Sequence, residues 1–312
     1  MDVLSDVVAV ARTGRPRSAH VRWHAPWGQE FAPVPGSAGF QVILRGSCWL
    51  LPPGAEPVRL GTGDVVFLPR GSGHTLADSP ERLAAAPVCG PEDHELLGAY
   101  ASDTVDRTGG RGPATVLLCG AYRLDPSRAH PLLSTLPDVI HLPAQPGRHP
   151  ELRSAVELLA AELESPRLGT DAAVPALLDT LLLYILRIWF AGRTTRAADT
   201  TGWAAALNDP AVTAALHAIH RDPAAPWTVA GLAAEAGLSR AHFARRFATL
   251  IGQPPLGYLT WWRMTTAARL LRTTDAPLRS IAAQVGYSSE FAFGNAFKRA
   301  NGTAPGVYRR KG

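Results

Sequence analysis

Cysteine is scarce in this chain. Cys48, Cys89 and Cys119 are the three cysteines among 312 residues, and they lie far apart. An odd number of scattered cysteines does not build the disulfide framework of a small secreted domain. A hydrophobic fraction of 46% with 18% charged residues is instead typical of an ordinary globular protein.

Targeting and membrane signals are also lacking. The first 18 residues have no basic region followed by a clean apolar stretch, so we expect no secretory signal. The most apolar run, residues 176–190, is short for a bilayer span and contains Asp179 and Arg187. No nucleophile elbow, phosphate-binding loop or dinucleotide fingerprint occurs. We therefore expect a cytoplasmic protein that is not an enzyme, with no catalytic residue to name.

Acidic residues are few in the last third of the chain. Residues 202–312 contain 13 Lys and Arg against 5 Asp and Glu, a net charge of +8, while the whole chain carries +5. Residues 1–201 are therefore slightly acidic. This asymmetry indicates that only the carboxyl-terminal part binds a polyanion.

Short strand-like runs fill the first 145 residues. Four of them, at residues 40–45, 48–51, 64–68 and 115–119, lie between glycines, prolines and other turn residues. Many short strands at regular spacing favour an antiparallel barrel or sandwich.

Helical spacing begins near Pro150. Residues 151–163 form one predicted helix, and a second runs from about Asp171 to Phe190 with Thr170 or Asp171 as its cap. The second helix is apolar on nearly all sides and must be covered. It either packs under the barrel or forms a dimer interface, and residues 192–201 read as a polar linker.

The last hundred residues contain a repeat. Residues 232–239 (LAAEAGLS) match residues 281–288 (IAAQVGYS), and beyond the turn the offset grows from 49 to 50. The later matched pairs are Phe243 and Phe293, Phe247 and Phe297, Gly252 and Gly302, Pro255 and Pro305, and Tyr258 and Tyr308. Each copy reads as a helix, a tight turn and a second helix.

Glycine and serine mark the turns. Gly237 and Gly286 end the first helix of each copy, since glycine tolerates a positive φ. Ser239 and Ser289 cap the second helix with a hydroxyl. The inward stripes are predicted to be Phe243, Phe247 and Leu250 in the first copy, and Phe293, Phe297 and Ala300 in the second.

The opposite stripes are predicted to contact DNA, because the second helix of such a unit lies in the major groove. The predicted DNA-binding residues are Ser239, Arg240, Ala241, Ala244 and Arg245, and Ser289, Glu290, Phe291, Gly294, Asn295 and Lys298. Arg240 and Arg245 suit guanine, Asn295 suits adenine and Phe291 suits a thymine methyl group. Gly294 allows a close backbone approach to DNA. The other basic residues, Arg263, Arg279, Arg299, Arg309, Arg310 and Lys311, are expected to contact phosphates or to be solvated.

One long helix is predicted between the two units, from Pro255 to about Thr274. It would span about 30 Å, close to the roughly 34 Å between adjacent major-groove faces. The alternative is a helical domain whose arginines are plain surface charge.

Residues 203–312 resemble the DNA-binding domain of the AraC/XylS family of regulators. The resemblance is carried by residues 281–293 (IAAQVGYSSEFAF), 296–299 (AFKR) and 302–309 (GTAPGVYR). Asn295 stands where the family commonly has arginine, and Ala241 and Ala244 are smaller than is common there. The resemblance implies binding to promoter DNA and an output through RNA polymerase.

The front of the chain is similar to the cupin-type effector domains of one branch of this family. Residues 61–74 (GTGDVVFLPRGSGH) carry the spacing of the second cupin motif, with Gly63, Pro69, Gly71 and His74. Residues 116–123 and 130–137 support the resemblance. Metal-binding cupins have an HxH pair in the first motif, and here residues 40–49 (FQVILRGSCW) contain no histidine. A cupin enzyme site is therefore incomplete.

Several residues are effector or sensor candidates. His74 with Cys89 or Cys119 suits a soft metal or a thiol sensor, although His74 can instead bond backbone while Cys119 packs in a strand. His20 and His24 are further possible ligands, and His130 reads as structural. Trp23, Trp27 and Trp49 either line a barrel cavity or belong to the core. We expect no cofactor and no metal.

The sequence thus predicts an α+β multidomain protein. Residues 1–145 form a cupin-like antiparallel β-barrel that senses a small molecule or chemical signal, residues 150–192 a helical linker or dimerisation segment, and residues 203–312 an all-α domain with two helix-turn-helix units. The predicted partners are promoter DNA, a small-molecule effector, RNA polymerase and a second copy of the chain, with no membrane. The alternatives are a metal-dependent cupin enzyme and an architectural DNA binder without an effector.

Overall fold

The computed structural model describes residues 3–11, 17–82, 88, 101–106, 112–123, 130–194 and 201–311. Two compact units divide the chain. The helical unit contains residues 1–11, 130–135 and 190–312, and the sheet unit contains residues 12–129 and 136–189. The domains predicted from the sequence have other boundaries, because residues 1–11 and 130–135 group with the carboxyl-terminal helices. The predicted boundaries therefore stay a prediction.

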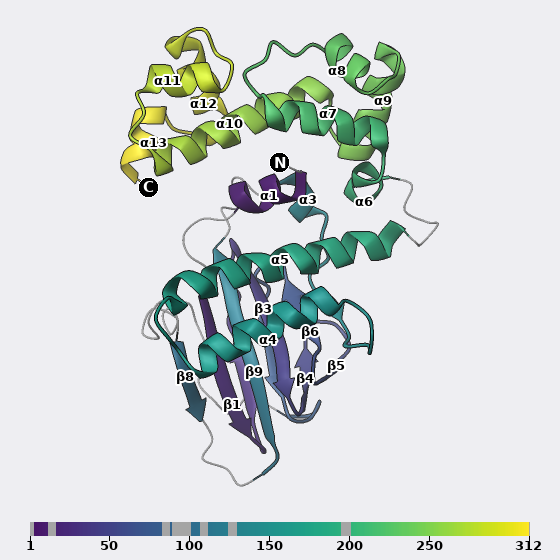
Figure 1. Ribbon diagram of the computed structural model, residues 1–312, viewed down its shortest axis with the longest axis vertical. Coiled ribbons are helices and arrows are strands. Elements are labelled where there is room, and N and C mark those ends of the chain that lie inside the picture. Colours follow the sequence, from purple (N-terminus) through teal and green to yellow (C-terminus); the bar gives the residue numbers. More distant parts are fainter. Residues whose placement is uncertain are drawn as a thin grey trace. The chain divides into compact units, whose positions relative to one another are not determined.

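The sheet unit contains two sheets, and the four predicted runs lie in β3, β4, β6 and β9 (Figure 1). One sheet has the strand order β10-β6-β3-β9-β1-β8, and the other has the order β2-β7-β4-β5. Neighbouring strands are antiparallel, except that β1 and β8 are parallel. The strands are β1 (Arg17–His24), β2 (Gly28–Phe31), β3 (Ser37–Arg45), β4 (Ser47–Leu51), β5 (Val58–Gly61), β6 (Val65–Leu68), β7 (His74–Ala77), β8 (Ala101–Asp106), β9 (Ala114–Arg123) and β10 (Ile140–Leu142).

A hydrophobic core lies between the two sheets. Alternation along β4 directs Cys48 and Leu50 into this core and leaves Trp49 on the opposite, partly exposed face. Trp23 and Trp27 stack in the core with their ring centroids 5.1 Å apart. Of the three tryptophans proposed to line a cavity, two are therefore core residues and Trp49 faces away from the core.

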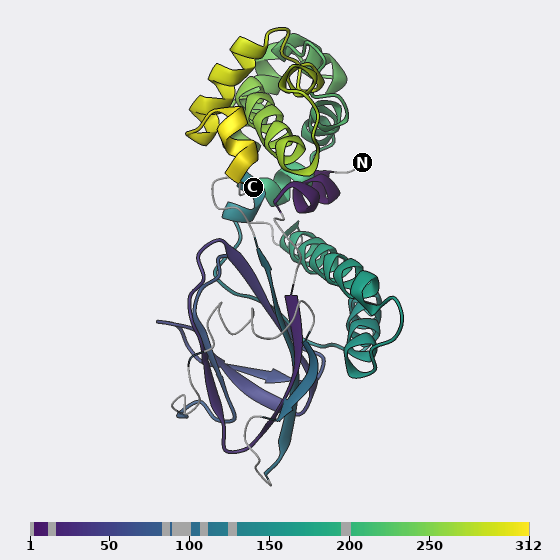
Figure 2. The same ribbon diagram turned by 90° about the vertical axis from the view of Figure 1, so that its left-hand side faces the viewer.

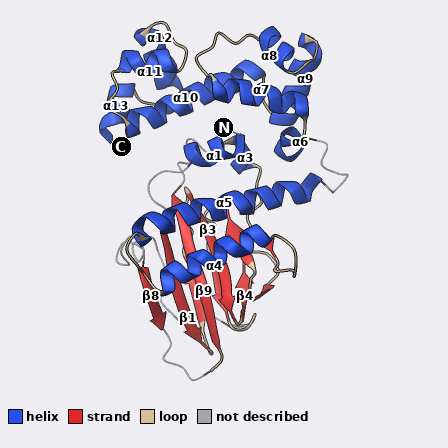
Figure 3. Ribbon diagram, in the orientation of Figure 1, coloured by secondary structure: helices blue, strands red, loops and turns tan. Residues whose placement is uncertain are grey.

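Two helices, α4 (Pro150–Glu164) and α5 (Thr170–Thr194), cover the outer face of the larger sheet. Figure 2 shows both helices on one side of the strands, and Figure 3 shows them in blue in front of β1, β9 and β3. On that face Tyr122 of β9 is buried, packs on Phe40 and donates its hydroxyl to the carbonyl of Leu178 in α5. Of the two open alternatives for the second helix, packing against the sheet is observed.

Helix α5 is longer than its most apolar run. By length and composition alone Thr170–Arg193 could cross a membrane, and 39% of its most apolar window is buried inside the protein. The helix contains Asp179 and Arg187 and buries Leu178, Leu182 and Ile185. We interpret it as a covering helix of the sheet unit, because its buried side meets Tyr122.

The helical unit contains both predicted helix-turn-helix pairs and the long helix between them. Its helices are α1 (Val3–Ala11), α3 (Pro131–Ser134), α6 (Trp203–Leu207), α7 (Pro210–Arg221), α8 (Val229–Glu235), α9 (Arg240–Ile251), α10 (Pro255–Thr273), α11 (Leu278–Gln284), α12 (Glu290–Asn301) and α13 (Pro305–Lys311). The sequence did not predict α1 and α3, which are short and join this unit from distant parts of the chain.

Candidate nucleic-acid interface

The two turns of the repeat have the same backbone geometry. Gly237 has φ +64° and Gly286 has φ +80°. After each glycine the next amide reaches back to the preceding helix: Leu238 N–H donates to Ala233 O at 3.0 Å, and Tyr287 N–H donates to Ala282 O at 2.9 Å. These are Schellman closures, which require a left-handed residue at the turn. The predicted role of both glycines is confirmed.

Serine caps both second helices as predicted. The Ser239 hydroxyl accepts from His242 N–H, and the Ser289 hydroxyl accepts from Ala292 N–H, each at 3.4 Å. Because the cap residue sets the direction in which a helix leaves its turn, the two serines fix how α9 and α12 are presented.

Aromatic residues anchor the inner face of each second helix. Phe243, Phe247, Phe293 and Phe297 are fully buried, as the periodicity predicts. Ala300 was expected to be buried and is exposed, and Ala296 is buried in its place. The reason is geometric: residue 300 belongs to the last turn of α12, just before Gly302 ends the helix with φ +71°.

The outer face of α9 is open to solvent. Ser239, Arg240, Ala241 and Arg245 are exposed, and Ala244 is half-buried. Within the part of the chain that the structure describes, the structure gives no hydrogen bond or ion pair to the guanidinium of Arg240 or Arg245. Two unengaged cations on one face of an exposed helix suit a polyanion.

Arg246, next to Arg245 in the chain, has a different role. Its guanidinium pairs with Asp209 through Nε and Nη2, and Asp209 also caps α7 by accepting from Val212 N–H at 2.9 Å. Burial alone would raise the pKa of Asp209, but the bonds from Arg246 and from the cap outweigh it and lower that pKa. Arg246 therefore fixes α9 against α7, whereas the Arg245 side chain is exposed.

The outer face of α12 is less basic. Glu290, Phe291, Asn295 and Lys298 are exposed, and the side chain of Phe291 keeps 79% of its surface accessible. Gly294 lies among them, and a Cβ added there would meet nothing within 4 Å. Packing inside the protein therefore does not require glycine at this position.

Helix α10 separates the two pairs. It has 19 residues, so it is about 28 Å long at 1.5 Å per residue. Figure 1 shows α8 and α9 near one end of α10, and α11 and α12 near the other. The predicted long helix is confirmed, ending within a residue of the expected position.

Two arginines expected to contact phosphates or solvent have structural roles. Arg263 donates from Nε to Pro223 O at 2.7 Å and from Nη2 to Ala225 O at 2.9 Å. Arg309 donates to the carbonyl of Ala276 at 2.5 Å. The sequence could not show this, because a backbone carbonyl group that accepts from a distant side chain leaves no trace in residue identity. The Arg263 guanidinium also occupies the space beside Gly286, where an added Cβ would lie 2.7 Å from Nη2.

Comparison with known proteins agrees with this geometry. A family model described as Cupin matches residues 2–191, and one described as Helix-turn-helix domain matches residues 232–311. A putative AraC-like transcription regulator of Streptomyces lividans is 37% identical over 311 residues, which is 99% of this chain and 98% of the relative. The chain belongs to the AraC-like transcription regulators.

Other relatives of this AraC-like regulator are also transcription regulators. A putative AraC-like transcription regulator of Streptomyces antibioticus is 37% identical over 312 residues, covering 99% of each chain. The HTH-type transcriptional regulator MtrA of Neisseria gonorrhoeae is 29% identical over 314 residues, covering 100% of this chain and 99% of the relative. Among solved structures, the DNA-binding domain of AdpA in complex with a target DNA is 35% identical, with a TM-score of 0.31, over 33% of this chain and 92% of that domain.

In the sheet unit of this AraC-like regulator, two of the sensor candidates line one small cavity of about 60 Å³. His74 is buried and stacks on Phe31, with the two ring centroids 4.7 Å apart. The distance between His74 Nε2 and Gln41 Nε2 is 3.1 Å. Cys119 lies in the same lining, with its Sγ 3.6 Å from the carbonyl of Ala19. Burial lowers the pKa of His74 to about 4. A neutral imidazole and a thiol therefore line the same cavity, but no group of three metal-binding side chains occurs among the described residues.

The remaining candidates do not join this cavity. Cys89 lies outside the described residues. His20 is buried 3.4 Å from Glu164, and burial lowers its pKa. His24 approaches the carbonyl of Gly112 at 3.2 Å. Trp49 faces away from the core between the sheets, so His74 and Cys119 are the one candidate pair that the structure brings together among the described residues.

A buried hydrogen-bonded chain in the helical unit was missed by sequence reasoning. His130 Nδ1 accepts from Leu132 N–H at 3.0 Å, so a neutral His130 carries its proton on Nε2 and donates it to Tyr258 Oη at 3.0 Å. Tyr258 in turn donates to His220 Nε2 at 2.7 Å. His220 donates from Nδ1 to Asp6 Oδ2 at 3.0 Å.

This chain of bonds joins three distant segments: α1, the α3 segment, and helices α7 and α10 of the carboxyl-terminal domain. Tryptophans enclose it, with Trp262 stacked on His220 at 3.8 Å and Trp203 edge-on to His130 at 4.7 Å. Burial lowers the pKa of both histidines, in His220 against the opposing effect of Asp6, and raises that of Tyr258. We call these four residues, Asp6, His130, His220 and Tyr258, the buried clamp. No short-range sequence pattern encodes the buried clamp, because Asp6 and His220 are 214 positions apart in the chain.

Proposed function

We propose that this AraC-like regulator recognises a specific promoter sequence with α9 and α12 in adjacent major grooves, and that α9 contributes most of the specificity. We further propose that a small molecule or chemical signal sensed by the cupin domain controls this binding. The proposal extends the family's DNA-binding role to particular helices and residues.

One observation carries the proposal: Arg240 and Arg245 are exposed on the outer face of α9 and have no partner among the described residues, while Arg246 is held by Asp209. A free guanidinium binds guanine in a bidentate manner, and each such contact discriminates by about 1–3 kcal/mol. The matching face of α12 presents Glu290 and Asn295, which supply less positive charge. The roughly 28 Å length of α10 suits a separation of about one helical turn of DNA.

Arg245→Ala tests the role of α9. We expect it to weaken binding to the protein's own upstream DNA by roughly 5- to 160-fold, which corresponds to about 1–3 kcal/mol, and to change binding to unrelated DNA little. A mobility-shift assay at several salt concentrations measures both, because phosphate contacts depend on salt and base contacts much less.

Arg221→Ala is the matched control, since it removes the same charge from an exposed position on α7 outside the α9 stripe. It should weaken specific and unspecific binding by the same small factor. Equal loss of specificity in both variants, or binding by the parent protein without sequence preference, would contradict the proposal.

The other partners are proposed on weaker support. Leu158 on α4 and Leu168 before α5 are exposed at 57% and 107% of the reference surface, and apolar side chains of this kind suit a homodimer interface between α4–α5 surfaces. The sedimentation velocity of the full chain measures this. Family membership supports action in the cytoplasm, through RNA polymerase and without a catalytic role.

A further inference from the structure

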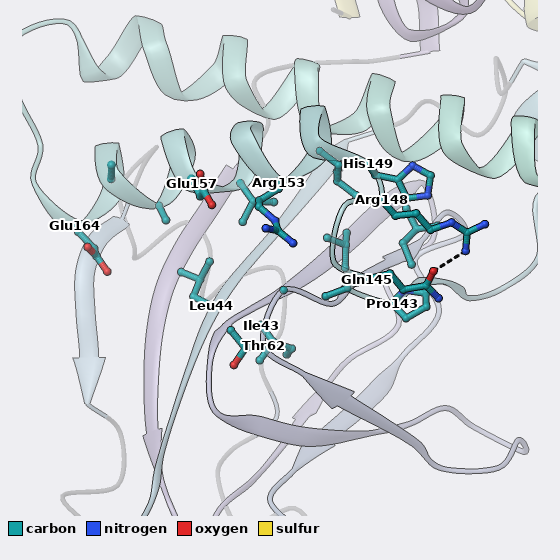
Figure 4. A pocket seen from close by; sticks show the side chains of 18 residues that line it. Ile43, Leu44, Thr62, Pro143, Gln145, Arg148, His149, Arg153, Glu157 and Glu164 are labelled. Atoms are coloured by element: carbon teal, nitrogen blue, oxygen red, sulfur yellow. Dashed lines mark hydrogen bonds between the residues drawn. The ribbon is translucent and has the colours of Figure 1, made fainter.

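A cavity of about 520 Å³ lies in the sheet unit between α4 and the larger sheet (Figure 4). It lies on the other face of the larger sheet from the core between the sheets, and Ile43 of that core also lines it. Val66 points into that core, so its neighbour Val65 faces the opposite way, and Leu142 pairs with Val65 in register. Both Val65 and Leu142 line the cavity.

The cavity has an apolar wall on each side. Val65, Leu142 and Leu44 supply the sheet side. On α4, Leu152, Val156 and Ala160 recur every four residues and therefore share one face of the helix. A volume of this size with mainly apolar walls suits a small organic molecule.

The rim at one end is held in place by Asp64. Its carboxylate accepts from Ala144 N–H at 2.7 Å and from Gly61 N–H at 3.1 Å, and pairs with His141 Nε2 at 3.0 Å. These bonds fix the segment after β10 against the turn before β6. The cavity is therefore largely preformed, which lowers the entropic cost of binding.

Charge is segregated along the cavity. Arg148, His149 and Arg153 lie at the start of α4, where the helix dipole is positive, and Glu157 and Glu164 lie further along it (Figure 4). Arg148 donates to Gln145 Oε1 at 2.6 Å. Within the described residues, the structure gives no partner to the guanidinium of Arg153, and Figure 4 shows this side chain pointing from α4 toward the cavity.

We propose that this cavity binds an amphipathic monoanion, an organic molecule with an apolar body and one acidic group. The acidic group lies between Arg148 and Arg153, and the body follows Leu152, Val156 and Ala160 along α4. Glu157 and Glu164 disfavour a second negative charge at the far end. An organic cation would leave Arg153 facing an apolar body. This inference rests on the proposed effector role of the cupin domain and assigns that role a place and a ligand class.

The cavity is connected along the chain to the buried clamp. Leu142 lines the cavity, and the segment that precedes β10 begins at α3, whose His130 bonds to Tyr258 of α10. An occupant that shifts Leu142 therefore acts on the same stretch of chain that holds α3. A bound anion is thus linked through the chain to α3, and through the His130–Tyr258 hydrogen bond to α10.

The test uses three probes of equal chain length with the full protein: octanoate, 1-octanol and octylamine. We expect octanoate to raise the melting temperature most and octylamine least, and calorimetric titration to give the affinities. Arg153→Gln should weaken octanoate binding at least tenfold and leave 1-octanol unchanged. Arg59→Gln, an exposed arginine on β5 away from the cavity, is the matched control and should leave both unchanged.

A second variant, Ala160→Trp, fills the cavity and should abolish binding of both octanoate and 1-octanol. Octanoate binding that neither Arg153→Gln nor Ala160→Trp reduces, tighter binding of octylamine, or no binding of any probe would each overturn the inference. DNA binding is measured separately in the mobility-shift assay. Octanoate bound in the cavity without any change in DNA affinity overturns its effector role, whereas a parent protein that fails to bind its upstream DNA counts against the proposed function instead.

Discussion

Gly294 lies in the middle of α12, where glycine is a poor helix former and where the surrounding space is empty. Ala in its place should stabilise the fold by about 0.5–1 kcal/mol. If the glycine serves a close approach of the helix backbone to DNA, the same variant should bind the operator less tightly. A protein that becomes more stable and less active is the expected outcome, measured by thermal melting and by the dissociation constant for the upstream DNA.

Gly306→Ala provides the matched comparison. Gly306 lies in helix α13, off the α12 face, and an added Cβ there also meets nothing within 4 Å. The Gly306→Ala variant should not melt at a lower temperature than the parent protein, and its affinity for DNA should be unchanged. Unaltered DNA binding in Gly294→Ala would show that this glycine has no part in recognition.

His74 should make the stability of the sheet unit sensitive to acid. Burial lowers its pKa to about 4, while in the unfolded chain it is near 6.5. The unfolded state therefore binds a proton first, so the stabilisation is complete above pH 6.5 and is lost progressively as pH falls toward 4. The loss is on the order of 3 kcal/mol.

Removing the imidazole isolates this effect. His74→Gln cannot titrate, so its free energy of unfolding should fall less steeply than that of the parent protein between pH 6.5 and 4. Denaturant titrations at several pH values measure the slope, and the other buried histidines are common to both proteins. Parallel curves for the two proteins would contradict the assignment.

At the scale of elements, α1 supplies a buried acceptor to helices far along the chain. Val3 and Val7 of α1 are buried with 2% and 0% exposure, and Asp6 accepts from His220. Asp6→Leu keeps the helix and its approximate volume but leaves the His220 N–H buried without an acceptor. We expect a loss of about 1–3 kcal/mol in stability, seen as a lower melting temperature.

Deleting residues 1–11 should cost more, because the apolar contacts of α1 are lost as well. Glu56→Leu, on the exposed turn between β4 and β5, is the control for replacing a carboxylate by leucine and should melt like the parent protein. Equal melting temperatures for the parent protein and the deletion would show that α1 does not belong to the helical unit.

The elements that local patterns encode were predictable. A glycine at a left-handed turn, a capping serine and phenylalanines at helical spacing each act within a few residues, so the sequence of one copy predicts the geometry around Gly237 and Ser239. Because the second copy repeats this pattern, the same reasoning predicts the turn between α11 and α12. Strand alternation and the turn residues around β3, β4, β6 and β9 act over similarly short distances.

Contacts between distant segments could not be predicted in this way. Arg263 and Arg245 look alike in the sequence, yet Arg263 bonds the carbonyls of Pro223 and Ala225, while Arg245 has no bonding partner in the part of the chain that the structure describes. The parallel pairing of β1 with β8 and the docking of α1 and α3 depend on topology rather than on local residue preference. Which of the exposed residues on α9 and α12 touch bases also stays a prediction, because exposure alone does not separate a base contact from a solvated charge.

At the scale of the whole molecule, the chain passes between its two units four times, after residues 11, 129, 135 and 189. The helical unit is consequently assembled from three separate stretches of sequence. Along the sequence, the stretch that contains α3 follows strand β9 and precedes strand β10 of the sheet unit. A displacement of either strand therefore acts on the segment that carries His130, which hydrogen-bonds Tyr258 in the helix between the two helix-turn-helix pairs.

This interleaving limits how such a regulator can be recombined with its relatives. A gene fusion that joins the first two hundred codons of one regulator to the last hundred of another would place a foreign α1 and α3 against His220 and Tyr258. Hybrids made by one crossover should then retain function only when the parents share compatible residues at positions 6, 130, 220 and 258. The cupin and helix-turn-helix parts of this protein are thus best exchanged together, and we expect a new specificity to be acquired more readily by changing the outer face of α9 than by exchanging whole domains.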